Sequence, residues 1–93
     1  MDTQKIGKNT KNADVATLSG KKFVVGAKQL RKAMHSKIVL HVFIARNADP
    51  AITAPIEQLC MDNSISYTWV KTMTDLGRAC GLEVGAATAA VVA

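Results

Sequence analysis

The spacing of hydrophobic residues along the chain predicts four strands with helices between them. Apolar runs typical of strands span residues 21–25, 37–45, 65–70 and 86–92. The second run is apolar at almost every position from 38 to 44, which indicates a central strand covered on both faces. Strands that alternate with helices favour the α/β class, here a three-layer α-β-α sandwich around a small mixed four-stranded sheet.

Helices are expected at about 26–36, 49–63 and 72–80. In the first, Ala27, Leu30 and Met34 recur on one face, so this face should pack against the sheet. The opposite face is crowded with the polar residues Lys28, Arg31, Lys32 and His35.

The second helix has a well-marked start. Asp49 is a good N-cap, and Pro50 suits the first helical position. Pro55 is predicted to kink this helix or to delay its regular part, with Thr53 as a second candidate cap.

Positive charge is concentrated in the first part of the chain. Residues 1–37 contain nine Lys and Arg against two Asp, a net charge of +7, and residues 38–93 contain three against five acidic residues, a net charge of −2. This asymmetry indicates a directed basic surface, although a solvated basic tail would give the same count. Residues 1–12 are interpreted as a flexible polar and basic tail, and 13–93 as one domain that opens with a short helix or turn at 13–19.

No motif supports a metal site, a disulfide framework, a membrane span or secretion. Cys60 and Cys80 form no CxxC pair, and His35 and His41 are not at ligand spacing from them, so no metal site is predicted. Two unpatterned cysteines fit buried thiols in a reducing cytosol. The polar N-terminus has no signal-peptide core, and no apolar run approaches about 18 residues, so a cytoplasmic protein is expected.

No catalytic motif is present, and no cofactor is expected. The chain has neither a Walker loop nor a GxGxxG after a strand, and no Ser or Cys stands in a nucleophile motif. His41 lies within the predicted central strand, where a hydrogen-bonded core histidine is the more ordinary interpretation. Aromatic residues are too few for a sheet that stacks single-stranded bases, and Trp69 is interpreted as a packing residue.

The turn after the first predicted strand carries the clearest binding signal. Gly26 ends an apolar strand, and a helix that opens with Lys28 and Gln29 follows directly. A helix start offers free backbone N–H groups and partial positive charge, and a side-chain amide can read a base edge. Arg31 and Lys32 add positive charge, so nucleic acid, and RNA in particular, is the favoured ligand. An ordinary amphipathic helix with a solvated basic face is the alternative.

A second stretch, 77–85, has a glycine at every fourth position. Its last two glycines are expected to bound a loop that displays Leu82, Glu83 and Val84. The two aliphatic side chains would then pack on an unstacked base or sugar, and the carboxylate would accept from a base amino group. Alternatively, Leu82 and Val84 fold into the core and Glu83 is a solvated charge. The sequence pattern leaves both interpretations open.

Together these segments resemble a known family, the kink-turn RNA-binding ribosomal proteins of the L7Ae and L30e group. The matching segments, in family order and spacing, are 26–32 (GAKQLRK), 48–50 (ADP), 59–62 (LCMD) with 65–67 (ISY), 76–81 (LGRACG) and 83–87 (EVGAA). They cover the chain from 15 to 92, approximately its whole folded part. Each segment alone is a weak signal of this family, but all of them together in the family's order and spacing are a specific one.

The resemblance implies an α-β-α sandwich that binds kink-turns, which are sharply bent RNA helices with an internal loop and tandem sheared G·A pairs. The start of the first motif helix would read the guanines in the opened major groove, and the loop after the last helix would cover the bulged nucleotides. By position, the RNA-binding residues implied are Gly26, Lys28, Gln29, Arg31, Lys32, Leu82, Glu83 and Val84.

One pair departs from the wider family pattern. Archaeal and eukaryotic members carry Asn-Glu where this chain has Lys28-Gln29, a pair that is similar to the small bacterial homologues. Gln29 lacks the negative charge that favours guanine N–H donors, and Lys28 adds attraction for phosphate.

The resemblance therefore implies a non-enzymatic, monomeric, cytoplasmic and bacterial protein that recognises kink-turn-like RNA. Ribosomal RNA is one candidate target, so a ribosomal or ribosome-associated role is expected. A protein-interaction module of the same fold, without specific RNA readout, is the alternative. A substrate-binding arm of an RNA methyltransferase is a third interpretation.

Overall fold

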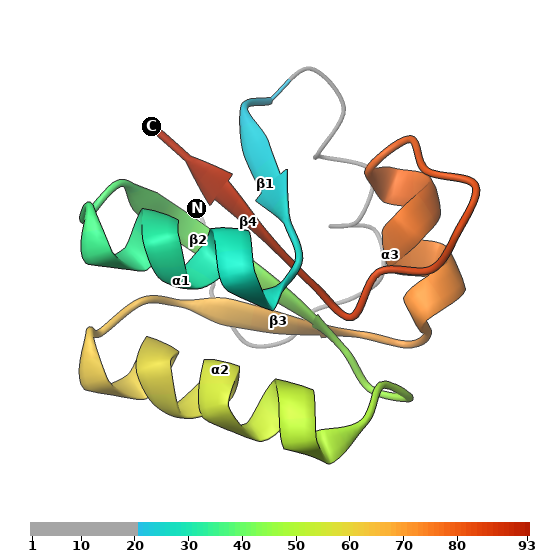
Figure 1. Ribbon diagram of the computed structural model, residues 1–93, viewed down its shortest axis with the longest axis horizontal. Helices are drawn as coiled ribbons and strands as arrows, with labels where there is room; N and C mark the ends of the chain where they lie inside the picture. Colours follow the sequence, from blue (N-terminus) through green and yellow to red (C-terminus); the bar gives the residue numbers. More distant parts are fainter. Residues whose placement is uncertain (1–20) are drawn as a thin grey trace, which may run out of the picture.

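The structure is a computed structural model that describes residues 21–93, in which strands and helices alternate along the chain (Figure 1). The elements are β1 (Phe23–Val25), α1 (Ala27–His35), β2 (Val39–Ala45), α2 (Pro50–Asp62), β3 (Tyr67–Val70), α3 (Met73–Ala79) and β4 (Thr88–Val92). All four predicted strands and all three predicted helices are present. Every strand begins slightly later than its predicted run, and before β3 the residue Ile65 packs on the core without joining the ladder. The tail expected at 1–12 and the helix or turn expected at 13–19 lie outside the described residues.

The four strands form one mixed sheet in the order β1-β4-β2-β3. β2 and β3 are parallel, with Val42 opposite Tyr67 and Ala45 opposite Val70. Parallel neighbours need a crossover connection, which α2 provides. β4 is antiparallel to both β1 and β2. The last strand therefore lies between the first two, and β2 is an interior strand, as its apolar run predicted.

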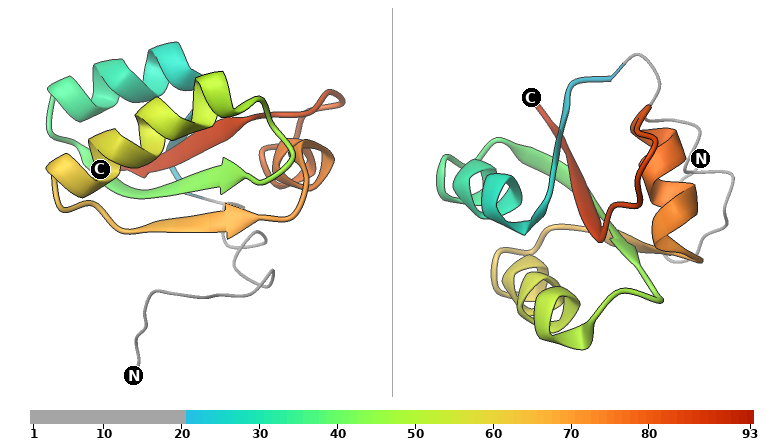
Figure 2. Two further views of the ribbon diagram at one scale, coloured as in Figure 1. Left: turned by 90° about the horizontal axis from the view of Figure 1, so that it is seen from below. Right: turned by 45° about the vertical axis from the view of Figure 1, so that its right-hand side comes forward.

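Helices cover both faces of this sheet, which confirms the α-β-α sandwich expected from the sequence (Figure 2). α1 and α2 lie side by side on one face, and α3 packs on the other. Side chains along β2 alternate between these layers. Val42 and Ile44 join the cluster under α1 and α2, whereas Phe43 and Ala45 join the cluster under α3.

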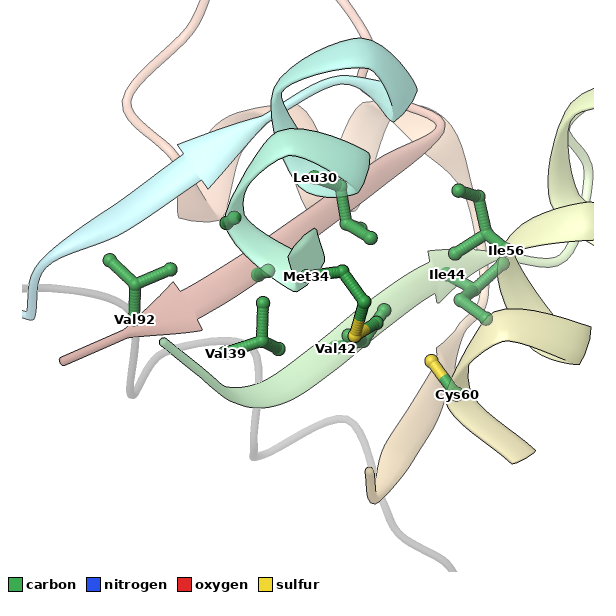
Figure 3. Packing of buried hydrophobic residues seen from close by; sticks show 10 residues of the cluster. Leu30, Met34, Val39, Val42, Ile44, Ile56, Cys60 and Val92 are labelled. Atoms are coloured by element: carbon green, nitrogen blue, oxygen red, sulfur yellow. The ribbon is translucent and has the colours of Figure 1, made fainter. Parts of the chain in front are cut away.

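The core under α1 and α2 fixes the orientation of α1 (Figure 3). Leu30 and Met34 pack from α1, and Ile56 and Cys60 pack from α2, against the strands. Leu30 is fully buried, and burying a leucine side chain contributes about 1.5–3 kcal/mol. The apolar face predicted for the first helix therefore anchors it, and the opposite face is left in solvent.

The first residues of β2 are not covered on both faces of the sheet. The pairing of β2 with β4 shifts between Val39 and His41, so Leu40 occupies a bulge and is 60% exposed. The prediction of a strand covered on both faces holds from Val42 to Ala45, where every residue is buried.

α2 is a single helix despite its internal proline. The Asp49 carboxylate accepts a hydrogen bond from the Ala51 N–H at 2.9 Å, and Pro50 follows the cap, as predicted. The prediction that Pro55 delays the regular part of the helix is wrong, and so is the second cap at Thr53, which is buried within the helix. Pro55 removes only the bond to the carbonyl of Ala51, and Ala51 is exposed, so water can satisfy that carbonyl.

Candidate functional site

The two segments with binding signals lie at one end of the sheet, where β1, β2 and β3 end and β4 begins (Figure 2). The Gly26 N–H donates to the Thr88 carbonyl at 3.0 Å, and the Ala45 N–H donates to the Ala87 carbonyl at 2.9 Å. The turn before α1 and the loop before β4 are therefore joined through the sheet. We call this region, residues 26–32, 46–49 and 80–87, the site end.

Gly26 sets the start of α1. Its φ is +96°, which L side chains rarely adopt, and a Cβ placed on it would meet nothing within 4 Å. The backbone conformation therefore requires glycine here, and the space beside it is open. Within the described chain, no side chain caps α1, and its first turn contains no acidic residue. The first N–H groups of the helix and their partial positive charge are consequently left unneutralised.

The solvent face of α1 carries the predicted cations and amide. Lys28, Gln29, Arg31 and Lys32 are all exposed. Lys28 lies in the first turn, where a cation opposes the helix dipole and lowers helix stability.

The loop after α3 is tied to that helix by its backbone. Gly81, with a φ of +76°, ends the helix. The Leu82 N–H then donates to the Gly77 carbonyl at 2.9 Å, and the Ala86 N–H donates to the Met73 carbonyl at 3.0 Å. Both ends of the loop are therefore held by the same short helix.

The side chains of this loop project into solvent. Leu82 is 38% exposed, Val84 is 71% exposed, and Glu83 is also exposed. The structure thus excludes the interpretation in which Leu82 and Val84 fold into the core, and contact of the loop with nucleotides stays a prediction. The loop offers two apolar contacts with a carboxylate acceptor between them.

Sequence reasoning missed Arg46, which follows β2 at the site end. Its N–H donates to the Val70 carbonyl at 2.8 Å, and its guanidinium carbon lies 5.5 Å from the centroid of the Trp69 ring. Trp69 itself packs against the core, as predicted. A cation directly after a buried strand is the only signal that the sequence offers, since the position of Arg46 over Trp69 depends on the pairing of β2 with β3.

His41 is hydrogen-bonded, as the sequence favoured, but it is only half-buried and lies outside the two core clusters. Its Nδ1 lies 2.7 Å from the Ser66 hydroxyl, and its Nε2 lies 2.8 Å from the Thr68 hydroxyl. Its ring also meets Phe43 edge to face at 4.9 Å. These contacts join β2 to Ser66 and to Thr68 of β3, so His41 stabilises the pairing of the two strands.

The remaining reactive groups do not assemble into a site. Cys60 and Cys80 are free thiols, and burial raises the pKa of Cys60 to about 11, with a smaller contribution from Glu57. Burial also raises the pKa of Cys80, which is only half-buried. Among residues 21–93, no group of three or more His, Cys, Asp or Glu is placed to hold a metal ion. Over the same residues, no helix has the length and apolar character needed to cross a membrane.

Residues 8–93 match the model of the ribosomal protein L7Ae/L30e/S12e/Gadd45 family. An RNA-binding protein of Caldanaerobacter subterraneus subsp. tengcongensis is 45% identical over 71 residues, which cover 76% of this chain and 87% of that protein. An RNA-binding protein of Halalkalibacterium halodurans is 41% identical over 68 residues, which cover 73% of this chain and 83% of that protein.

Solved structures share the fold. A Giardia lamblia 15.5kD RNA binding protein superposes with a TM-score of 0.73 at 27% identity, over 86% of this chain and 66% of that chain. A protein with unknown function from Bacillus halodurans C superposes with a TM-score of 0.78 at 20% identity, over 89% of this chain and 87% of that chain. The second likeness concerns the fold alone.

Proposed function

Because this chain belongs to the ribosomal protein L7Ae/L30e/S12e/Gadd45 family, we propose that it binds structured RNA containing kink-turns and catalyses no reaction. The relatives in Caldanaerobacter and Halalkalibacterium are RNA-binding proteins by name. The observation that carries the proposal is the placement of two suitable segments at one end of the sheet: the start of α1, which no side chain of residues 21–93 caps, and the exposed 82–84 loop. A kink-turn offers a widened groove to the first segment and unstacked loop nucleotides to the second.

In this proposal the start of α1 enters the groove. Gln29 presents an amide that both donates and accepts, which suits the edges of the G·A pairs. Lys28 and Lys32 contact phosphate oxygens, and Arg31 adds to the positive field. The open space beside Gly26 lets the RNA approach the helix start.

The 82–84 loop supplies the second contact. Leu82 and Val84 pack on the unstacked nucleotides of the internal loop, and Glu83 accepts a hydrogen bond from a base amino group. Arg46 adds a cation at the same end of the sheet, with its guanidinium placed over Trp69.

The same relatives support a proposal for the setting of this activity. Both of the named relatives are bacterial proteins. We therefore propose that this protein acts as a monomer in a bacterial cytoplasm, on ribosomal RNA or another structured RNA.

An electrophoretic shift at physiological salt tests the proposal. The full chain is titrated into a kink-turn RNA and into the same RNA with its tandem G·A pairs disrupted. The intact kink-turn should bind about tenfold more tightly or better, since each good base contact discriminates by about 1–3 kcal/mol. Equal affinity for the two RNAs would reject specific readout. A protein complex that survives nuclease treatment would favour the protein-interaction module instead.

A further inference from the structure

Gly77, in the middle of α3, lies directly against the loop of the proposed RNA interface. A Cβ placed on Gly77 would overlap the carbonyl oxygen of Val84 and would lie 3.1 Å from the Cα of Gly85. Gly77 is also buried. Only a residue without a side chain therefore allows the loop backbone to lie against the helix backbone.

Gly85 makes the same close approach from the loop side. A Cβ placed on it would lie 3.0 Å from the Met73 Cβ and 3.3 Å from the Met73 carbonyl carbon. The hydrogen bonds of Leu82 to Gly77 and of Ala86 to Met73 join the same two segments. Two close backbone contacts and two hydrogen bonds thus fix a loop of a few residues.

These contacts explain why the apolar side chains of the loop remain in solvent. Leu82 and Val84 would each lower their free energy by folding onto the protein surface. The loop backbone cannot move closer to α3, because the Val84 carbonyl oxygen already occupies the space beside Gly77. The side chains are consequently displayed before any ligand arrives.

We infer that Gly77 and Gly85 are positioning residues that hold the 82–84 loop in its RNA-binding shape in the free protein. The inference rests on the proposed function. A loop that is already fixed loses less conformational entropy on binding, so part of the affinity for RNA comes from this backbone contact.

The variant Gly77→Ala in the full chain tests the inference by two measurements. The amides of Leu82 and Ala86 should exchange with solvent faster than in the wild type, while those of β2 and β4 keep their protection. Affinity for a kink-turn RNA should fall by about tenfold or more. Wild-type exchange at both amides and wild-type affinity in a folded Gly77→Ala variant would overturn the inference.

Leu76→Ala is the matched control for loss of stability. Leu76 is fully buried in the same helix, so its truncation leaves a cavity without adding an atom next to the loop. Under conditions where it is folded, this variant should keep its RNA affinity within about twofold. If it loses as much affinity as Gly77→Ala, general destabilisation explains both variants and the inference fails.

Gly85→Ala decides the question if Gly77→Ala does not fold. The added Cβ would press on Met73. The amides of Leu82 and Ala86 should therefore exchange faster with solvent than in the wild type. Affinity for kink-turn RNA should fall in proportion to this increase in exchange. Unchanged amides and affinity there would overturn the inference. A wild-type protein that does not bind kink-turn RNA would reject the proposed function, whereas the exchange measurements would still test how the loop is held.

Discussion

The hydroxyl of Tyr67 on β3 donates a hydrogen bond to the carboxylate of Glu57 on α2 at 2.9 Å. This bond links the middle of the crossover helix to the edge strand that the helix precedes. The bond to Glu57 raises the pKa of Tyr67 above its ordinary value of 10.0, because ionised Tyr67 can no longer donate and would face a carboxylate.

Tyr67→Phe should lower the free energy of unfolding by about 0.5–1.5 kcal/mol at pH 7, the usual contribution of such a bond. The folded pKa is raised, so this stabilisation is complete below the unfolded pKa near 10.0 and is lost as the pH rises toward the folded value. Urea unfolding of both proteins at pH 7 and at strongly alkaline pH measures the difference. If the difference in unfolding free energy between the wild type and Tyr67→Phe does not shrink at alkaline pH, this account is contradicted.

The two thiols should react at very different rates in the folded protein. Cys60 is fully buried with a pKa of about 11, so little thiolate forms near pH 8 and the sulfur is shielded. Cys80 is only half-buried and should react first with an aromatic disulfide reagent. Cys80→Ser isolates Cys60, whose reaction should then follow opening of the core. Equal rates for the two thiols in native protein would show that α2 opens readily.

Gln29→Ala should weaken binding of an intact kink-turn by about 1–3 kcal/mol, because it removes the base-edge contact that we propose for this residue. An RNA with disrupted G·A pairs should be affected much less. Gln58→Ala is the matched control, since Gln58 is an exposed glutamine on α2 that bonds only Asp62 in the described contacts. Loss of affinity for both RNAs alike would mean that Gln29 does not read sequence.

Lys28→Ala should weaken binding of every RNA tested by a similar factor, because in the proposed complex it removes a phosphate contact. The slope of log affinity against log salt should become shallower by about 1. Lys37→Asn is the control, because it removes one positive charge just before β2, at the end of the strand opposite the site end. Asparagine tolerates the φ of +59° that Lys37 adopts. An unchanged salt slope in Lys28→Ala would exclude a direct phosphate contact.

Val84→Gln should reduce affinity for kink-turn RNA by about 1 kcal/mol, since it replaces part of an apolar contact surface. Stability should change by less than about 0.5 kcal/mol, because Val84 is 71% exposed. Met61→Gln, at an exposed apolar position near the end of α2, should change neither quantity. If Val84→Gln and Met61→Gln change RNA affinity equally, the 82–84 loop has no specific role in RNA binding.

Local patterns in the sequence predicted most of the fold. The apolar spacing around Leu30 defines which face of α1 is buried, because helical periodicity is set within a few residues. The Asp49 cap and the apolar run that became β2 are equally local signals. The delay predicted from Pro55 is wrong, because α2 runs from Pro50 to Asp62 without a break, with Ile56 and Cys60 packed in the core beyond the proline.

The resemblance to the family correctly indicated the group to which the chain belongs, and the contact of its eight candidate residues with RNA stays a prediction. Their exposure and mutual position came from the tertiary structure. Whether Leu82 and Val84 lie in the core or in solvent depends on where α3 and the loop backbone meet, at Gly77 and Gly85. The spacing of hydrophobic residues does not encode that contact.

What the sequence determined by itself is the order of the elements and the buried face of α1, since both follow from the chemistry of near neighbours along the chain. Only the tertiary structure decided that Gly26 lies beside Thr88 and that Arg46 lies over Trp69. Those pairs are distant in sequence and are brought together by strand order and register. The site end therefore exists only once the sheet has formed.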